Sequence, residues 1–87
     1  MTYVFKFSDE AKEDVLNLPN VIKERIGKKI KYFAGLPDVF TVAKRLTNSD
    51  LGEARFRVGD YRIIFEMEGE NAIRVLRIRH RSSVYKD

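Results

Sequence analysis

The chain has 87 residues, of which 44% are hydrophobic and 34% are charged. A chain of this length forms one domain, here residues 1–87, near the lower size limit for a self-sufficient core, and its apolar content is too high for a disordered protein. It has neither an apolar run of about 18 residues that would span a membrane nor the apolar N-terminal stretch of a signal peptide, so the cytoplasm is the expected compartment.

The composition excludes several kinds of site. The chain has no cysteine, which rules out disulfides, a thiolate zinc site and a cysteine nucleophile. Its one histidine, His80, rules out a multi-histidine metal site and any mechanism that needs two imidazoles. We therefore expect no bound metal and no other cofactor.

Basic residues are concentrated in the second half of the chain. The net charge is +4, and eight of the nine arginines follow residue 44. Arginine presents a planar fork that binds phosphate through two hydrogen bonds, and it also stacks on bases. Arginine is also common on exposed strands for no functional reason, but the clustering of eight favours an acidic partner such as nucleic acid.

The first half of the chain predicts a strand and a helical hairpin. Residues 3–7 alternate aromatic and other side chains, as a strand does, and Ser8 is a good helix N-cap. The first helix has apolar residues at helical spacing, namely Ala11, Val15 and Leu18, and it ends at Pro19. The second begins near Asn20, ends before Gly35 and carries an apolar stripe of Ile22, Ile26, Ile30 and Phe33.

The second half predicts strands joined by turns. We expect strands over residues 41–46, 53–58, 61–67 and 72–79, with turns at 48–52, 59–60 and 69–71 and a short tail over 80–87. Gly59 in first position of a two-residue turn suits type II′. The chain is therefore predicted to be of the α+β class: an N-terminal strand, a helical hairpin, and then a three- to four-stranded, mainly antiparallel sheet.

The two-residue turn predicts the pairing of the hairpin. It places Arg57 opposite Arg62 and Arg55 opposite Ile64, with all three arginines on one face. Like charges directly across a strand pair repel. Either the guanidinium groups splay into water, or they form a cradle that an anion completes, and we favour the cradle because unfavourable local choices gather at functional sites. Arg77, Arg79 and Arg81 alternate in the same way, and they share a face if the last strand continues that far.

These segments resemble the RelE/ParE superfamily of toxins from type II toxin–antitoxin systems. The resemblance rests on the lysine-rich helical hairpin, on residues 43–68 with the motif VGDYRIIF, and on residues 75–87 with the motif HRSSVY. It covers nearly the whole chain. The RelE branch cleaves messenger RNA in the ribosomal A site, and its active surface is a basic sheet face with a C-terminal tyrosine. The resemblance therefore implies a RelE-like fold, a cognate antitoxin as partner, the ribosome and mRNA as targets, and no membrane association.

The resemblance also assigns site residues. Arg62 matches the core arginine of the family, Arg81 the second arginine and Tyr85 the terminal tyrosine. Cleavage without a metal requires that the 2′-hydroxyl lose a proton, that the phosphorane charge be neutralised and that the 5′-oxygen gain a proton. Arginine suits only the second task, because its pKa exceeds about 12. We assign Arg62 and Arg81 to the phosphate and treat Tyr85 and His80 as the acid–base candidates. Further RNA contacts are expected from Arg55, Arg57, Arg79 and Lys44.

Two other functions stay open. A ParE-type toxin would inhibit DNA gyrase through protein contacts and have no nuclease site. A catalytically inactive homologue would bind RNA or its antitoxin without cleaving. The combination of Arg62, Arg81 and Tyr85 favours the nuclease, because the ParE branch generally lacks the full set.

Overall fold

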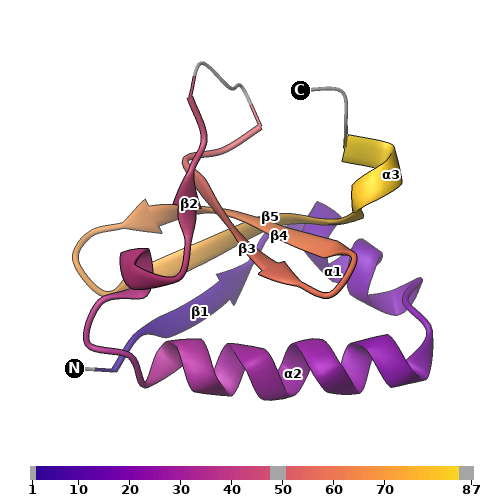
Figure 1. Cartoon of the computed structure of the whole chain (residues 1–87), viewed down its shortest axis with the longest axis horizontal. Coiled ribbons are helices and arrows are strands. Elements are labelled where there is room, and N and C mark those ends of the chain that lie inside the picture. Colours follow the sequence, from indigo (N-terminus) through magenta and orange to yellow (C-terminus); the bar gives the residue numbers. More distant parts are fainter. Residues whose placement is uncertain (1, 48–50, 85–87) are drawn as a thin grey trace.

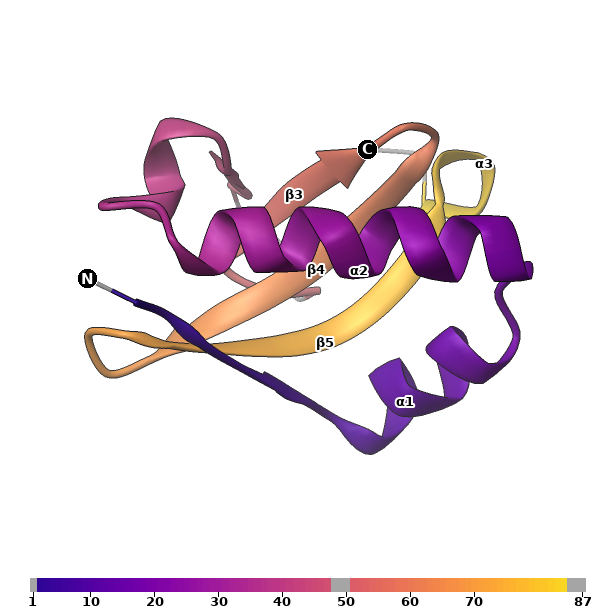
Figure 2. The same ribbon diagram turned by 90° about the horizontal axis from the view of Figure 1, so that it is seen from below.

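A computed structural model describes residues 2–47 and 51–84 (Figure 1). The strands are β1 (Val4–Phe7), β2 (Lys44–Arg45), β3 (Ala54–Val58), β4 (Tyr61–Glu68) and β5 (Ala72–His80). The helices are α1 (Asp9–Leu16), α2 (Asn20–Ala34), the 3-10 turn η1 (Val39–Thr41) and the short α3 (Arg81–Val84). The strands form one sheet in the order β1-β5-β4-β3-β2, and α2 runs along one of its faces (Figures 1 and 2).

The sheet confirms the predicted α+β class and adds a parallel edge. Four strands follow the helices, which is the larger number of the predicted three- to four-stranded sheet. β1 joins these strands as a fifth. All neighbouring strands are antiparallel except β1, which pairs in parallel with β5. The strand expected over residues 41–46 is shorter than predicted, because η1 occupies its start. The expected turn residues 48–50 lie outside the described part of the chain.

Ser8 connects the first strand, the first helix and the last strand. Its hydroxyl accepts a hydrogen bond from the Ala11 N–H at 3.0 Å, which is the predicted N-cap. The same hydroxyl donates to the Leu76 carbonyl at 2.9 Å, and the Ser8 N–H donates to the Val75 carbonyl. Ser8 is 5% exposed, and this bonding satisfies its polar atoms inside the core.

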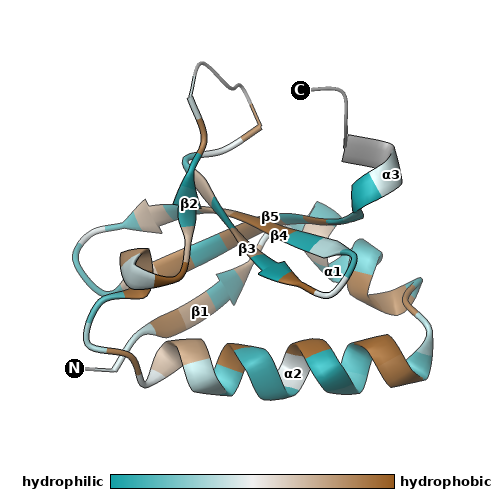
Figure 3. Cartoon of the chain, in the orientation of Figure 1, coloured by the Kyte–Doolittle hydropathy of each residue, from teal (hydrophilic) through white to brown (hydrophobic). Residues whose placement is uncertain are grey.

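The core lies between α2 and the sheet. Polar and apolar segments alternate along α2 (Figure 3), and its apolar residues pack on the inward side chains of the strands. Phe56 of β3 stacks between Phe33 of α2 and Phe65 of β4, at centroid distances of 4.1 and 4.5 Å. Phe56 and Phe65 are completely buried. This aromatic stack holds the long helix against the middle of the sheet.

The β3–β4 hairpin has the predicted register. Val58 pairs with Tyr61, Arg57 with Arg62 and Arg55 with Ile64. Gly59 has a φ of +59°, the left-handed value that the first position of a type I′ or II′ turn requires.

A β-bulge, which the sequence did not predict, interrupts the β4–β5 ladder. Phe65 pairs with Val75 and Ile64 pairs with Arg77, so Leu76 has no partner on β4. Gly52 lies over this irregularity, where an added Cβ would be 2.7 Å from Ile64 Cγ2 and 3.2 Å from Leu76 Cδ1. The segment before β3 therefore covers this part of the sheet so closely that any residue other than glycine would force its neighbours to shift.

Candidate nucleic-acid interface

Three arginines form a row across the middle of the sheet. Arg57 of β3 pairs with Arg62 of β4, and Arg62 pairs with Arg79 of β5. Residues that pair directly share a face of the sheet, and alternate residues of a strand point to opposite faces. Because the neighbouring residues Phe56 and Ile63 belong to the core under α2, the arginine row lies on the face away from α2.

The environment of the arginines changes along the row. Arg57 is exposed, Arg62 is only 6% exposed and Arg79 is half-buried. A second pair of cations lies beside the row, since Lys44 of β2 pairs with Arg55 of β3. The predicted phosphate-binding residues therefore share one face of the sheet, which we call the arginine face: Lys44, Arg55, Arg57, Arg62 and Arg79.

Asp14 of α1 neutralises one further arginine. Its carboxylate accepts hydrogen bonds from Arg77 Nε at 2.9 Å, Arg77 Nη2 at 3.1 Å and the Ile78 N–H at 2.8 Å. Partial burial raises the pKa of Asp14, but the hydrogen bonds from Arg77 and Ile78 and the charges of Arg77 and Arg79 outweigh it and lower the pKa below 3.8. The same hydrogen bond raises the pKa of Arg77. Arg77 is thus bound to Asp14 of α1. Arg79 is the residue of β5 that continues the row.

Arg81 lies in a different place from the one its spacing indicated. β5 ends at His80, so Arg81 begins α3 and does not continue the strand alternation. Its backbone N–H donates to the Asp60 carbonyl at 2.7 Å, and its Nη1 lies 3.9 Å from an Asp60 carboxylate oxygen. The β3–β4 turn therefore positions the start of α3, which lies on the side of the sheet opposite α2 (Figure 1). Tyr85 lies outside the described residues.

His80 does not share a face with the arginine row. It pairs with Tyr61, and the two rings meet edge to face at 5.2 Å, whereas its neighbour Arg79 belongs to the row. The Ser82 N–H donates to His80 Nδ1 at 3.2 Å, and the Ser82 hydroxyl lies 2.8 Å from the same nitrogen. Because a backbone N–H can only donate, Nδ1 acts as an acceptor, and the neutral ring carries its proton on Nε2.

The sequence analysis did not identify Asp14 or Ser82 as residues of the site. Asp14 is separated from Arg77 by 63 positions, so no local pattern joins them. Ser82 is adjacent to the HR motif, and its closeness to His80 was a usable signal once the tail was recognised as a helix.

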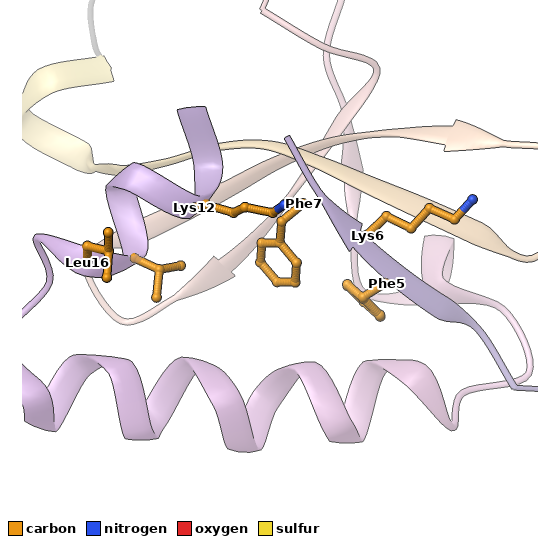
Figure 4. Close-up of a pocket in the computed structure, with 6 residues that line it drawn as sticks. Phe5, Lys6, Phe7, Lys12 and Leu16 are labelled. Carbon is orange, nitrogen blue, oxygen red and sulfur yellow. The ribbon is translucent and has the colours of Figure 1, made fainter. Parts of the chain in front are cut away.

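An apolar pocket lies at the opposite edge of the sheet. It has a volume of about 430 Å³ and lies between β1 and α1 (Figure 4). Its lining residues are Phe5, Lys6, Phe7, Lys12, Val15 and Leu16. Leu16 is 70% exposed. The Val4 and Ser8 N–H groups donate toward β5, so the alternating N–H groups of Phe5 and Phe7 face the open edge.

Two features are absent from the described ranges 2–47 and 51–84. These ranges contain no cluster of three or more His, Cys, Asp or Glu side chains placed to hold a metal ion. None of their helices is both long enough and apolar enough to cross a membrane.

Comparisons with known proteins place the chain among toxins. The family model described as "ParE toxin of type II toxin-antitoxin system, parDE" matches residues 5–85. No curated protein sequence gives a significant match. Among solved structures, the chain is similar to a chain of the toxin–antitoxin complex RelBE2 from Mycobacterium tuberculosis, with 25% identity, 94% of each chain covered and a TM-score of 0.79.

Two further solved structures extend the comparison. A chain of the RelB–RelE antitoxin–toxin complex from Methanococcus jannaschii is 27% identical, with 92% of this chain and 94% of that chain covered and a TM-score of 0.71. A chain of the chromosomal ParDE system from P. aeruginosa is 14% identical, with 91% and 96% covered and a TM-score of 0.65. Relatives of both the RelE and the ParE type therefore share this fold.

Proposed function

The chain belongs to the ParE toxin family of type II toxin–antitoxin systems and is the toxin of such a pair, and from that premise we propose that it is a ribosome-dependent endonuclease that cleaves messenger RNA in the cytoplasm. The observation that carries the proposal is the row of Arg57, Arg62 and Arg79 across three strands. Adjacent like charges repel each other, and an anion placed between them relieves that repulsion. A phosphodiester supplies that anion and accepts the paired N–H groups of guanidinium.

Burial of the central arginine favours catalysis over loose binding. Arg62 is 6% exposed, so its charge acts where the effective dielectric constant is lower than in water. A cation held in such a place stabilises the extra negative charge of the phosphorane without having to reorganise. Arg57 and Arg79 on either side, with Arg55 and Lys44 beside them, align the RNA backbone.

Proton transfer is assigned to groups other than arginine. In our proposal the Tyr85 phenolate takes the proton of the attacking 2′-hydroxyl, whose oxygen bonds to phosphorus as the bond from phosphorus to the 5′-oxygen breaks. His80 Nε2 gives the departing 5′-oxygen a proton, and the products are a 2′,3′-cyclic phosphate and a 5′-hydroxyl. The Ser82 N–H occupies His80 Nδ1, and Nε2 presents a proton, so His80 is arranged to donate a hydrogen bond and not to act as the base. Arg81 lies at the start of α3, on the same side of the sheet as the arginine face, and adds a further contact to the phosphate.

The partner of the toxin is an antitoxin, and the apolar pocket beside β1 is its docking site in our proposal. The open edge of β1 can accept an added strand, and the pocket provides a place for an apolar side chain of that strand. Lys6 and Lys12 at the rim favour a segment that carries acidic residues.

The test is a cleavage assay on ribosomes programmed with a defined mRNA, with cut sites mapped by primer extension beside a ribosome-free control. We expect cuts at a fixed A-site position that disappear in Arg62→Ala. Arg74→Ala is the matched control, because Arg74 is an exposed arginine near the other end of β5, paired with Glu68. In cells, Arg62→Ala and Tyr85→Phe should relieve growth arrest. Growth arrest that survives both substitutions contradicts the nuclease proposal.

Inhibition of DNA gyrase is the second candidate, and the description of the matching family model favours it. It predicts that folded protein makes no ribosomal cuts and inhibits supercoiling in a gyrase assay, whether or not Arg62 is present. Absence of both activities, with retained RNA or antitoxin binding, identifies an inactive homologue.

A further inference from the structure

We propose that α2 carries a second RNA-binding surface, so that the toxin is held between two parts of a folded RNA. The surface is a stripe of four exposed residues, Arg25, Lys28, Lys29 and Tyr32, which we call the α2 stripe. Their spacing of three and four places them on one flank of the helix, away from the buried Ile26 and Phe33. The proposal rests on the proposed nuclease function, because it assigns a further contact to the same RNA target.

Within the described residues, the cations of the α2 stripe form no close ion pair, although the exposed Glu24 precedes Lys28 by four positions. From Arg25 to Pro37 the sequence has no acidic residue. Cations three and four residues apart on a helix repel each other and cost about 0.2–0.5 kcal/mol per pair. The helix therefore carries a repulsion that folding does not require.

The helix dipole does not account for the stripe. A positive charge is favourable only in the last turn of a helix, and the basic residue of that turn is Lys31. Arg25 and Lys28 lie in the middle of α2, where the dipole gives no benefit. The exposed cations in the middle of the helix thus need another explanation.

Tyr32 points to nucleic acid as the ligand of the stripe. Its side chain is 55% exposed, and Lys29 Nζ lies 5.7 Å from the centre of its ring. An exposed aromatic ring among cations can stack on a base while the cations contact phosphates, which is how proteins bind the unpaired bases of single strands and of the loops in folded RNA. The stripe provides both kinds of contact within three turns of helix.

The α2 stripe and the arginine face lie on opposite sides of the sheet. Figure 2, seen from below, shows α2 in front of β3, β4 and β5. The arginine row lies on the other face of the sheet, because the alternate residues Phe56 and Ile63 pack in the core under α2. The two surfaces approach each other at the β3–β4 turn, where an added Cβ on Gly59 would be 2.9 Å from Arg25 Nη1. Acidic residues are concentrated elsewhere, on α1 (Asp9, Glu10, Glu13, Asp14) and around the β4–β5 turn (Glu66, Glu68, Glu70).

The dimensions of the molecule identify the kind of RNA. The molecule measures 31 × 30 × 23 Å, so two RNA segments bound to opposite sides are about as far apart as the molecule is thick. A short single strand lying on the arginine face does not reach the stripe. A folded RNA with two walls around a cavity contacts both surfaces at once. The stripe therefore gives selectivity for structured RNA, such as that of the ribosome, over free messenger RNA.

The test compares binding of two probes, purified ribosomes and a four-nucleotide single-stranded RNA that is too short to pass from the arginine face around the β3–β4 turn to the stripe, over a range of salt concentrations. In the variant Arg25→Gln/Lys28→Gln/Lys29→Gln, we expect ribosome affinity to fall by about 100-fold near 0.15 M salt, and the slope of log affinity against log salt to decrease by about 2–3. Tyr32→Leu should weaken ribosome binding about 10-fold. Binding of the short RNA should change less than about two-fold.

Matched controls keep the test independent of folding and of the proposed function. Lys23→Gln removes one charge from the other flank of α2 and should leave ribosome affinity unchanged, whereas Lys28→Gln alone should lower it.

Unchanged ribosome affinity in the triple variant, or an equal loss for both probes, overturns the α2 stripe. Loss of antitoxin binding with retained ribosome binding also overturns it and identifies a protein interface. If Arg62→Ala retains full cleavage, the proposed active site fails, while a selective loss of ribosome binding in the triple variant still supports the stripe.

Discussion

The carboxylate of Asp14 joins α1 to the strand that carries Arg79, and its removal is expected to destabilise the fold. The substitution Asp14→Asn keeps one oxygen that can accept the Ile78 N–H but removes the charge and places an NH₂ donor against Arg77. The Ile78 N–H and Arg77 Nε both donate to Oδ2, so an asparagine oxygen in that place keeps these two bonds, and the substitution loses the bond from Arg77 Nη2 to Oδ1 together with the charge.

The magnitude follows from the exposure of the two partners. Hydrogen bonds to charged groups contribute about 1.5–3 kcal/mol each. The side chain of Asp14 is 15% exposed, but that of Arg77 is 39% exposed and can rehydrate when its partner is lost. We therefore expect a loss of about 2 kcal/mol in the free energy of unfolding, well below the cost of breaking a fully buried pair, which is about 3–5 kcal/mol. For a domain of this size, about 2 kcal/mol lowers Tm by about 8–16 °C.

The effect depends on pH in a defined direction. The folded state holds the pKa of Asp14 below its ordinary value of 3.8, so the ionised carboxylate stabilises the fold at any pH above that value. This stabilisation is lost as the pH falls through the lower pKa of the folded state. The difference between wild type and Asp14→Asn should therefore be constant from pH 7 to pH 5 and become smaller below pH 4.

Urea unfolding followed by circular dichroism at pH 7, 5, 4 and 3 measures this difference. Glu13→Gln is the matched control, because it removes an exposed carboxylate from the same helix and should change stability by less than about 0.5 kcal/mol. An Asp14→Asn protein as stable as wild type at pH 7, or a difference that does not decrease at low pH, refutes the reasoning.

The remaining predictions concern packing and charge. Phe56→Ala removes the central ring of the aromatic stack and should cost about 3–5 kcal/mol, measured by chemical unfolding. Gly52→Ala should cost about 1–3 kcal/mol because its Cβ has no room, whereas Gly27→Ala, with nothing within 4 Å, should stabilise the helix by about 0.5–1 kcal/mol; thermal melts of the pair check both signs. Arg57→Ala should leave Tm unchanged or raise it slightly, because repulsion with Arg62 is relieved, yet weaken RNA binding in an anisotropy assay.

Local signals in the sequence were sufficient for the hairpin that carries the site. Gly59 and Asp60 determine a two-residue turn, the turn determines the register, and the register places Arg57 opposite Arg62. The helices were equally accessible, because Ser8 as N-cap and the apolar stripe of α2 are properties of neighbouring residues. These elements were confirmed because each depends on interactions over a few positions.

The rest of the site depends on contacts between distant residues. The pairing of Asp14 with Arg77 spans 63 positions, and the parallel pairing of β1 with β5 joins the two ends of the fold. The end of β5 at His80 is likewise set from a distance, because the Asp60 carbonyl accepts the Arg81 N–H. Periodicity cannot reveal such pairings, so the alternation of Arg77, Arg79 and Arg81 suggested one shared face, whereas the structure places the three arginines in different environments.

The pairing of β1 with β5 also determines the order in which the protein can fold. The chain is synthesised from its N-terminus, yet β5, which pairs with β1, is made after every other strand of the described sheet. Until then β1 lacks the backbone partners that β5 provides, and the apolar faces of α1 and α2 have only part of their sheet. Contacts of such long sequence separation slow folding. The arginine row is completed by the same late strand, so the nascent chain cannot assemble the arginine face before β5 has been synthesised.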